Sequence, residues 1–442
     1  PAEWPAGAQP VSRKMQYDAL YRLTQLDYVY PATDDTWVSP NNVDLAGPAD
    51  TRRSRPRPEV SFPKRIKQQT FAFDWLGNIT QSGDDAGGFW DRSLGTQTHG
   101  TNTPYQLTSA VGVSGGARTG RVDVQYDAAG NVKLLQLNRS GPCLPSGAKC
   151  NQRFDYQWDE VNRLQAATRN DVTTQAEALG AAEAQLNYKY DSSDERTLKV
   201  AVDAVGQTRH AVYPFDTFEL RGATYDSSAR RYQRDSNTEV PYLMAHGVRL
   251  ARVAYSPITD NVPRLNNATV HVFLEVRDQL GSPVGIVDRD TGELVERSTF
   301  EAYGATESDY RPDRWKGFRE DYKFTGKEED LEVGLQYFGE RYLSPYLNRW
   351  ISPDPLAIHV PNSEDLNVYA YVKGHVLTSV DLTCLAETAP IGVNVTPAQQ
   401  KAMVLSEGDY FFIDPKGSGT QKFGNLGQIR AEAAKRGVPG FQ

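Results

Sequence analysis

The chain has 442 residues, of which 39% are apolar and 24% charged, so it is polar but globular and long enough for two or three domains. Its formal net charge of −8 argues against nonspecific binding of the whole chain to nucleic acid or to a membrane surface. No stretch approaches the roughly 18 apolar residues of a membrane-spanning helix. The 23 Tyr, 7 Trp and 36 Gly favour many short strands joined by tight turns.

A short motif recurs five times in the first half of the chain. It consists of an aromatic residue, an Asp, two or three spacers and then a pair such as Gly-Asn or Arg-Leu, and each copy predicts a strand, a turn and a second strand. The Asp is expected to be a turn residue rather than a catalytic one. One hairpin cannot bury its apolar face, so neighbouring copies must share a sheet. The copies lie at residues 17–24, 73–80, 126–132, 158–164 and 190–196.

The spacing between copies is irregular, which predicts loops inserted between the hairpins. Residues 39–69 and 82–120 are expected to be loop-like, and the basic run at 51–58 fits a solvated charged loop better than a patch for an anionic partner. Residues 175–185, rich in Ala and Glu, predict one surface helix.

The three cysteines are too few for a disulfide scaffold. Cys143 and Cys150 flank a turn-rich loop, where a local bridge and two unrelated thiols are equally reasonable. The ligands that a zinc site would need are not found nearby, and the six His are scattered. We therefore expect neither a metal nor a cofactor.

The most informative stretch is residues 322–385, which contains four multi-residue motifs in order. They are Tyr322-Lys-Phe-Thr-Gly-Lys-Glu, Gly334-Leu-Gln-Tyr-Phe-Gly-Glu-Arg-Tyr342, Arg349-Trp-Ile-Ser-Pro-Asp-Pro355 and Asn367-Val-Tyr-Ala-Tyr371. Together with the upstream repeats, they resemble the core segment of RHS/YD-repeat proteins, including bacterial Rhs toxins and the insecticidal toxin-complex C component. Residues 277–288 and 301–304 resemble turns that precede this segment in the family.

The resemblance implies an all-β fold in which YD-repeat hairpins wind into a spiralling hollow shell closed by an inward-folded core segment. We expect a YD-repeat shell at residues 1–310, a core or plug segment at 311–385, and variable C-terminal cargo or a toxin stub at 386–442. In the tail, residues 396–405 and 428–436 predict helices, and residues 408–415 predict a strand ending in a turn.

The resemblance also implies intramolecular cleavage by an aspartic protease site. Matching the family motifs gives Arg341, Asp354 and Asp381, with the cut between Leu385 and Ala386. Two neighbouring carboxylates with separated pKa values can act as base and acid in peptide hydrolysis.

Each site residue also has a structural interpretation. Arg349 is a further candidate, but both it and Arg341 could be strand-end charges, and Asp354 could merely cap a turn. Asp365 is a weaker candidate that fits a loop residue better, and Cys384 has no neighbouring His to make it a nucleophile.

The scissile end departs from the family pattern. Where the family has Asp-Pro-x-Gly-Leu, this chain has Asp381-Leu-Thr-Cys-Leu385. The missing Pro frees φ, and Cys384 adds a Cβ where a positive φ would favour Gly. Slow cleavage and no cleavage both stay open.

The resulting hypothesis is a secreted bacterial toxin-delivery shell that encapsulates a C-terminal toxin and frees it by self-cleavage. The alternatives are a cleavage-incompetent structural shell or surface-interaction protein and an unrelated all-β enzyme acting on carbohydrate. The chain begins at Pro1 without a leader-like segment, and its shell is small for the family, so we expect a fragment or processing product. Expected partners are an N-terminal shell half or B-type protein, a translocation apparatus, and cargo inside the shell.

Overall fold

The structure is a computed structural model, and its chain divides into two compact units, Pro1–Pro390 and Ile391–Gln442, which are treated separately. The described residues are 4–31, 34–40, 62–141, 143, 147–233, 239–245, 248–255, 270–315, 318–355, 367–381, 387–388, 410–413 and 420–423.

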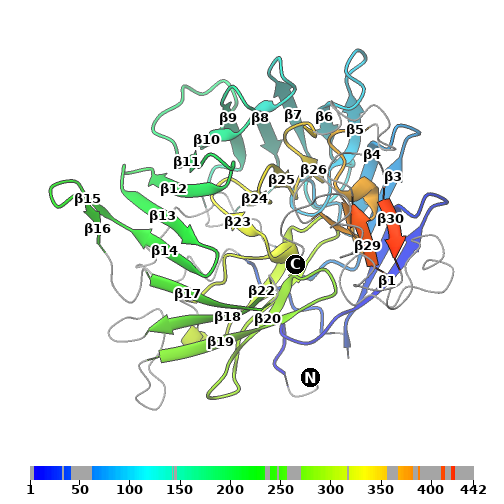
Figure 1. Ribbon diagram of the computed structural model, residues 1–442. Coiled ribbons are helices and arrows are strands. Elements are labelled where there is room, and N and C mark those ends of the chain that lie inside the picture. The colour runs from blue at the N-terminus through cyan, green and yellow to red at the C-terminus, as the bar shows by residue number, and fades with distance from the viewer. Residues whose placement is uncertain are drawn as a thin grey trace. The chain divides into compact units, whose positions relative to one another are not determined.

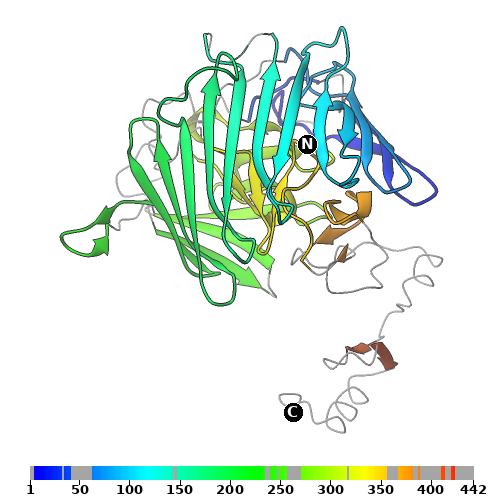
Figure 2. The ribbon, with the colours of Figure 1, turned by 90° about the horizontal axis from the view of Figure 1, so that it is seen from above.

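The first unit is built on one antiparallel sheet of 20 strands, in which each strand pairs with its neighbours along the chain. Figures 1 and 2 show this sheet curling around the core segment, and the predicted all-β fold is confirmed. The strands are β1 (Ser12–Tyr17), β2 (Leu23–Val29), β3 (Gln68–Phe73), β4 (Ile79–Asp84), β5 (Gly95–His99), β6 (Leu107–Val111), β7 (Gly120–Tyr126), β8 (Val132–Arg139), β9 (Asn151–Trp158), β10 (Leu164–Val172), β11 (Ala184–Tyr190), β12 (Arg196–Asp203), β13 (Thr208–Phe215), β14 (Phe218–Ala223), β17 (Glu239–Ala245), β18 (Val248–Tyr255), β19 (Val270–Arg277), β20 (Pro283–Asp288), β21 (Leu294–Phe300) and β22 (Thr306–Tyr310).

The remaining elements are short. A separate hairpin, β15 (Tyr225–Asp226) and β16 (Arg231–Tyr232), projects from the sheet in Figure 2. The core segment carries a four-stranded antiparallel sheet, three 3₁₀ turns and a two-stranded ladder. These are β23 (Glu328–Asp330), β24 (Leu335–Tyr337), β25 (Tyr342–Ser344), β26 (Arg349–Trp350), η2 (Asp313–Trp315), η3 (Phe324–Gly326), η4 (Val372–Gly374), β27 (Val380–Asp381) and β28 (Glu387–Thr388).

The repeat motif folds as the sequence predicts, with its Asp as a turn residue. At Asp74, for example, Oδ1 accepts hydrogen bonds from the backbone N–H groups of Leu76 and Asn78. The third residue after each of the five aspartates has a positive φ, and in three of the five copies it is Gly or Asn, which adopt this conformation most readily. These residues are Tyr21, Gly77, Gly130, Asn162 and Asp194. The Asp is therefore the hydrogen-bonding centre of each turn.

Neighbouring turns are joined sideways into a rim. Asn131 Nδ2 donates to Asn162 Oδ1 at 2.8 Å, and Arg163 Nη1 contacts Asp194 Oδ1 at 2.6 Å. The core segment closes on the same rim, because the Tyr369 hydroxyl donates to the Gly130 carbonyl at 2.7 Å.

The core segment is buried against the inner face of the sheet, which confirms that it folds inward. One apolar cluster joins Leu135, Phe154 and Leu186 of the sheet to core-segment residues such as Leu335 and Ile351. A second joins Leu23, Phe71 and Phe300 to Phe324, Trp350 and Tyr371. Burial of large apolar side chains from both partners makes the plug part of the hydrophobic core of this unit.

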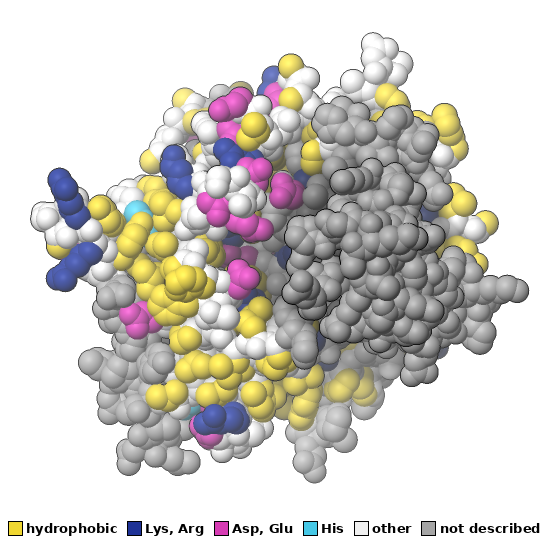
Figure 3. Space-filling view, in the orientation of Figure 1, with side chains coloured by type: hydrophobic (Ala, Val, Ile, Leu, Met, Phe, Trp, Pro, Cys, Tyr) yellow, Lys and Arg dark blue, Asp and Glu magenta, His cyan; other side chains and the backbone are white. Residues whose placement is uncertain are grey.

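The outer face of the sheet changes character along the chain. On β7 and β9 it carries paired charges, Arg121–Asp123 and Arg153–Asp155. On β17–β19 it carries exposed aliphatic side chains, and Figure 3 shows hydrophobic side chains gathered over these strands. They are Leu243, Val248, Leu250, Val270, Leu274 and Val276.

Two local predictions are wrong. Residues 175–183 form turns, bends and irregular loop instead of a helix, and residues 184–185 begin β11. The Gln175 side chain donates to the carbonyls of Leu137 and Gln152, and Glu177 binds the Thr173 N–H and Lys149, so tertiary contacts override helix propensity. Residues 82–120 contain β5 and β6 as well as loops, because Gly and Thr tolerate a strand once neighbouring strands pair with it.

Other local expectations have mixed outcomes. Cys143 and Cys150 form a disulfide, which decides between the two alternatives. In the second unit, β29 (Tyr410–Ile413) pairs with β30 (Thr420–Phe423), which confirms the strand predicted there. The predicted helices at 396–405 and 428–436 and the basic run at 51–58 lie outside the described residues.

Candidate active site

The candidate residues Arg341, Asp354 and Asp381 come from three parts of the core segment. Arg341 follows the tight turn at Gly339, whose φ of 112° favours glycine. The Arg341 carbonyl accepts a hydrogen bond from the Phe338 N–H. Asp354 follows β26, where its backbone N–H donates to the Val368 carbonyl at 3.0 Å. Asp381 ends β27.

The structure brings these three side chains together. Arg341 Nη2 lies 3.1 Å from Asp354 Oδ2 and 3.4 Å from Asp381 Oδ2. Because both oxygens contact one nitrogen, the two carboxylates are separated by no more than these two contacts laid end to end. The two carboxylates therefore meet at one guanidinium nitrogen.

The trio is unevenly exposed. The side chains of Arg341 and Asp381 are 4% and 6% exposed, whereas that of Asp354 is 22% exposed. Asp354 is therefore the member of the trio that water can reach.

Arg349 is held by different contacts. Its Nη2 donates to the Tyr105 carbonyl at 2.6 Å, its Nη1 lies 3.4 Å from His99 Nε2, and its guanidinium covers the Tyr369 ring. Burial, reinforced by the Arg349 charge, lowers the pKa of His99 to about 4. A neutral imidazole can therefore accept from Arg349, which ties β26 to the shell near Asp354.

The predicted scissile bond lies outside the described residues, as do Cys384 and Asp365. The strands on either side of it are described: β27 pairs with β28, so that Asp381 stands opposite Glu387 and Val380 opposite Thr388. The chain thus returns past Asp381 directly after the predicted cut between Leu385 and Ala386.

A second buried charge cluster, which the sequence analysis missed, joins the shell to the core segment. Arg196 on β12 contacts Glu328 Oε2 at 2.5 Å and Asp330 Oδ2 at 2.9 Å. Lys199 contacts the other oxygens of the same two carboxylates at 2.5 and 2.7 Å. The signal in the sequence was the acidic run Glu328-Glu329-Asp330, which lies in a strand buried on both faces. We call these four residues the Arg196 cluster.

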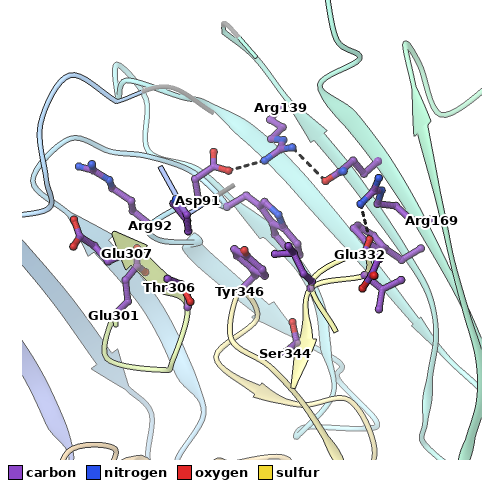
Figure 4. Close-up of a pocket in the computed structure, with 18 of the residues that line it drawn as sticks. Asp91, Arg92, Arg139, Arg169, Glu301, Thr306, Glu307, Glu332, Ser344 and Tyr346 are labelled. Atoms are coloured by element: carbon purple, nitrogen blue, oxygen red, sulfur yellow. Dashed lines mark hydrogen bonds and ion pairs between the residues drawn. The ribbon is translucent and has the colours of Figure 1, made fainter. Parts of the chain in front are cut away.

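A cavity of about 100 Å³ lies between the shell and the core segment, and Figure 4 shows residues that line it. The stacked rings of Trp90 and Tyr346 lie along it, with centroids 5.4 Å apart. Arg139 contacts Asp91 at 2.6 Å, and Arg169 donates to the Glu332 carbonyl. The residues that line it do not include Arg341, Asp354 or Asp381.

Across the described residues, no group of three or more His, Cys, Asp or Glu side chains could hold a metal ion. In the same part of the chain, no helix has the length and apolar character needed to cross a membrane.

Comparison with known proteins supports the resemblance to RHS-type toxin proteins. No protein-family model matches the chain. The toxin subunit YenC1 of Yersinia entomophaga is 23% identical over 392 residues, which covers 76% of this chain and 38% of YenC1. The tRNA nuclease WapA of Bacillus subtilis is 25% identical over 271 residues, covering 59% of this chain and 11% of WapA. The chain therefore spans well under half of the curated relatives it matches.

Among solved structures, the chain matches the TcdB2–TccC3–Cdc42 complex with a TM-score of 0.45 and 17% identity, over 85% of this chain and 17% of the matched chain. A structure of the Photorhabdus luminescens Tc holotoxin pore matches with a TM-score of 0.42 and 17% identity, over 87% of this chain and 18% of the other.

Proposed function

We propose that the chain is part of a secreted bacterial toxin-delivery shell and that it cuts itself between Leu385 and Ala386. The observation that carries this proposal is the contact of Arg341 Nη2 with both Asp354 and Asp381. Similarity to a toxin subunit supports the delivery role, and the position of β28 opposite β27 brings the chain beyond the cut back to Asp381.

In the proposed reaction, one carboxylate removes a proton from a water that attacks the Leu385 carbonyl carbon. The protonated carboxyl of the pair donates its proton to the Ala386 nitrogen as the peptide bond breaks, leaving a carboxyl at Leu385 and an amine at Ala386. Arg341 holds the carboxylates in place and offsets their charge through charge-assisted contacts. Each chain reacts once.

The proposal extends to partners and cargo. Relatives and matched structures carry the names of toxin subunits, a TcdB2–TccC3 assembly and a holotoxin pore, so we propose a B-type or N-terminal shell partner and a translocation apparatus. Residues 386–442 would be cargo held inside the completed shell.

The alternative is a structural shell that does not cut itself. The observation that favours it is the replacement of the family's Pro and Gly by Leu382 and Cys384. Misplacement of the scissile carbonyl by about 1 Å can slow an intramolecular reaction roughly a hundredfold.

Asp354→Asn tests the proposal. The wild-type chain should give two bands on a denaturing gel, corresponding to residues 1–385 and 386–442, and the variant should give one band with an unchanged unfolding midpoint. Asp290→Asn, at an exposed aspartate of the shell that contacts Arg289, is the matched control and should be cut normally. Leu382→Pro combined with Cys384→Gly should speed cutting. An uncut wild-type chain that is also uncut in the Pro/Gly variant would favour the structural alternative.

A further inference from the structure

We infer that Trp350 is a positioning residue for the proposed self-cleavage, because its indole face fixes the direction in which Arg341 points. This inference rests on the proposed function. Its starting observation is that the guanidinium carbon of Arg341 lies 4.3 Å from the centroid of the Trp350 ring.

A stacked indole restricts an arginine in a way that a hydrogen bond does not. The guanidinium is planar and stacks on aromatic faces, and tryptophan is the strongest aromatic partner for a cation. Arg341 has several rotatable bonds, so without a surface beneath it Nη2 could leave the two carboxylates at little cost. Stacking on Trp350 leaves the edge of the guanidinium free for Asp354 and Asp381, which that edge contacts.

Trp350 is itself held rigidly. Its side chain is 1% exposed, and Phe338 and Tyr371 pack against it edge to face, with centroids 5.1 and 5.4 Å away. Its backbone N–H donates to the Tyr369 carbonyl at 3.0 Å, and in β26 it pairs with Leu343. Strand, loop and aromatic neighbours therefore fix the plane on which Arg341 rests.

The inferred positioning role does not depend on the N–H group of the indole. Trp350 Nε1 is buried, and it makes no hydrogen bond to any residue that the structure describes. A ring without this N–H should therefore serve equally well, provided that it presents a π face. This separates the inferred role from that of a hydrogen-bond donor.

The test uses two substitutions with opposite expectations. Trp350→Phe keeps an aromatic face and should retain cleavage within about threefold, whereas Trp350→Leu keeps apolar bulk without the face and should slow cleavage about 10- to 100-fold. Trp90→Leu is the matched control, because it removes a buried indole that stacks on Tyr346 instead of an arginine. This control should be cut at the wild-type rate, and unfolding midpoints measured in parallel would show how much stability each chain has lost.

The pH profile of cleavage distinguishes positioning from general destabilisation. A nearby cation favours the ionised form of a carboxyl, and loosening Arg341 moves this cation away from the aspartate pair. The acid limb of the rate profile should therefore move to higher pH in Trp350→Leu and stay in place in Trp350→Phe and Trp90→Leu. A purely structural role would lower the rate at every pH without moving this limb.

The outcomes separate the two proposals. If wild-type chain is not cut, the proposed function fails. If wild type is cut and Trp350→Leu is cut at the same rate with the same pH profile, the positioning role is overturned while self-cleavage stands. Equal slowing in Trp350→Phe and Trp350→Leu would also overturn it, since the aromatic face would then be irrelevant.

Discussion

Two arginines in this molecule make the same kinds of contact but differ in the charges and the solvent around them. Arg196 and Arg341 each contact two carboxylates and each stack on an aromatic ring, Tyr337 at 4.1 Å and Trp350 at 4.3 Å. In the Arg196 cluster, Lys199 contacts the same two carboxylates, so the four charges balance. At Arg341, one guanidinium serves two aspartates, and Asp354 is partly open to solvent.

The comparison shows how differently two arginine–carboxylate contacts can be surrounded, because one is enclosed together with Lys199 and the other is partly open to solvent. Burial alone would raise the pKa of Glu328, but Lys199 and Arg196 outweigh it and lower that pKa to about 2, so this carboxylate of the Arg196 cluster stays ionised. The partial exposure of Asp354 admits water beside Arg341, as the proposed cleavage requires. The Arg196 cluster holds shell and plug together through buried ion pairs.

The largest expected effect is the loss of stability when an ion pair of the Arg196 cluster is removed. Arg196→Met should lower the free energy of unfolding by about 3–5 kcal/mol, because it leaves buried carboxylates short of one positive charge. Denaturant unfolding measures this. Arg121→Met, which breaks the exposed Arg121–Asp123 pair, is the control and should cost under about 1 kcal/mol. Equal losses in the two variants would show that the cluster does not attach the plug.

The next effect concerns pH. Glu296 lies at the interface of shell and plug, where burial, and then repulsion by Asp309, raise its pKa to about 7. A carboxyl whose folded pKa exceeds its unfolded value stabilises the fold while protonated, so this contribution is lost as pH rises from about 4.5 through 7. The cost at pH 8 is about 3 kcal/mol at most.

The contribution of Glu328 to stability depends on pH in the opposite direction. Because its folded pKa is lowered to about 2, its contribution is present above the unfolded pKa and is lost as pH falls toward 2. Unfolding midpoints measured from pH 3 to pH 9 should therefore peak near about pH 4.5, where both contributions are present. Glu296→Gln should flatten the decline on the alkaline side while leaving the acid side unchanged, and an unaltered alkaline decline would assign it to other groups.

The smallest effect on stability, but a large one on chemistry, is expected for Arg341→Lys. The lysine ammonium group keeps the positive charge. It lacks the planar guanidinium that can stack on an aromatic ring and contact two carboxylates at the same time. The unfolding free energy should change by about 1 kcal/mol, while cleavage slows about 10- to 100-fold on a gel time course. Wild-type cutting rates in this variant would mean that the geometry of the guanidinium is unimportant.

Much of the fold could be predicted because local chemistry decides it. The Asp-centred turns follow from short-range hydrogen bonds that residues such as Asp74 and Gly77 encode directly. Arg341, Asp354 and Asp381 were predicted from resemblance alone, since their motifs are up to 40 residues apart and no local rule brings them together.

What could not be predicted depends on distant partners. The turns at 175–183 are set by Leu137 and Gln152, and the Arg196 cluster joins strands more than 100 residues apart. The role of Trp350 was hidden for the same reason, because a buried tryptophan in a strand is usually just core.

The short ladder between β27 and β28 has a mechanical consequence. Glu387 and Thr388 lie beyond the predicted cut, yet they pair with Asp381 and Val380 and belong to the first compact unit. Hydrolysis before Ala386 would thus leave the new amino terminus docked on the plug as a strand. A ladder of two residue pairs is worth only about 1–2 kcal/mol, and a pull along the tail would peel it open one pair at a time. Cleavage of the peptide bond and release of the tail would therefore be separate events. The first is chemical, and the second needs only a small force to separate β28 from β27.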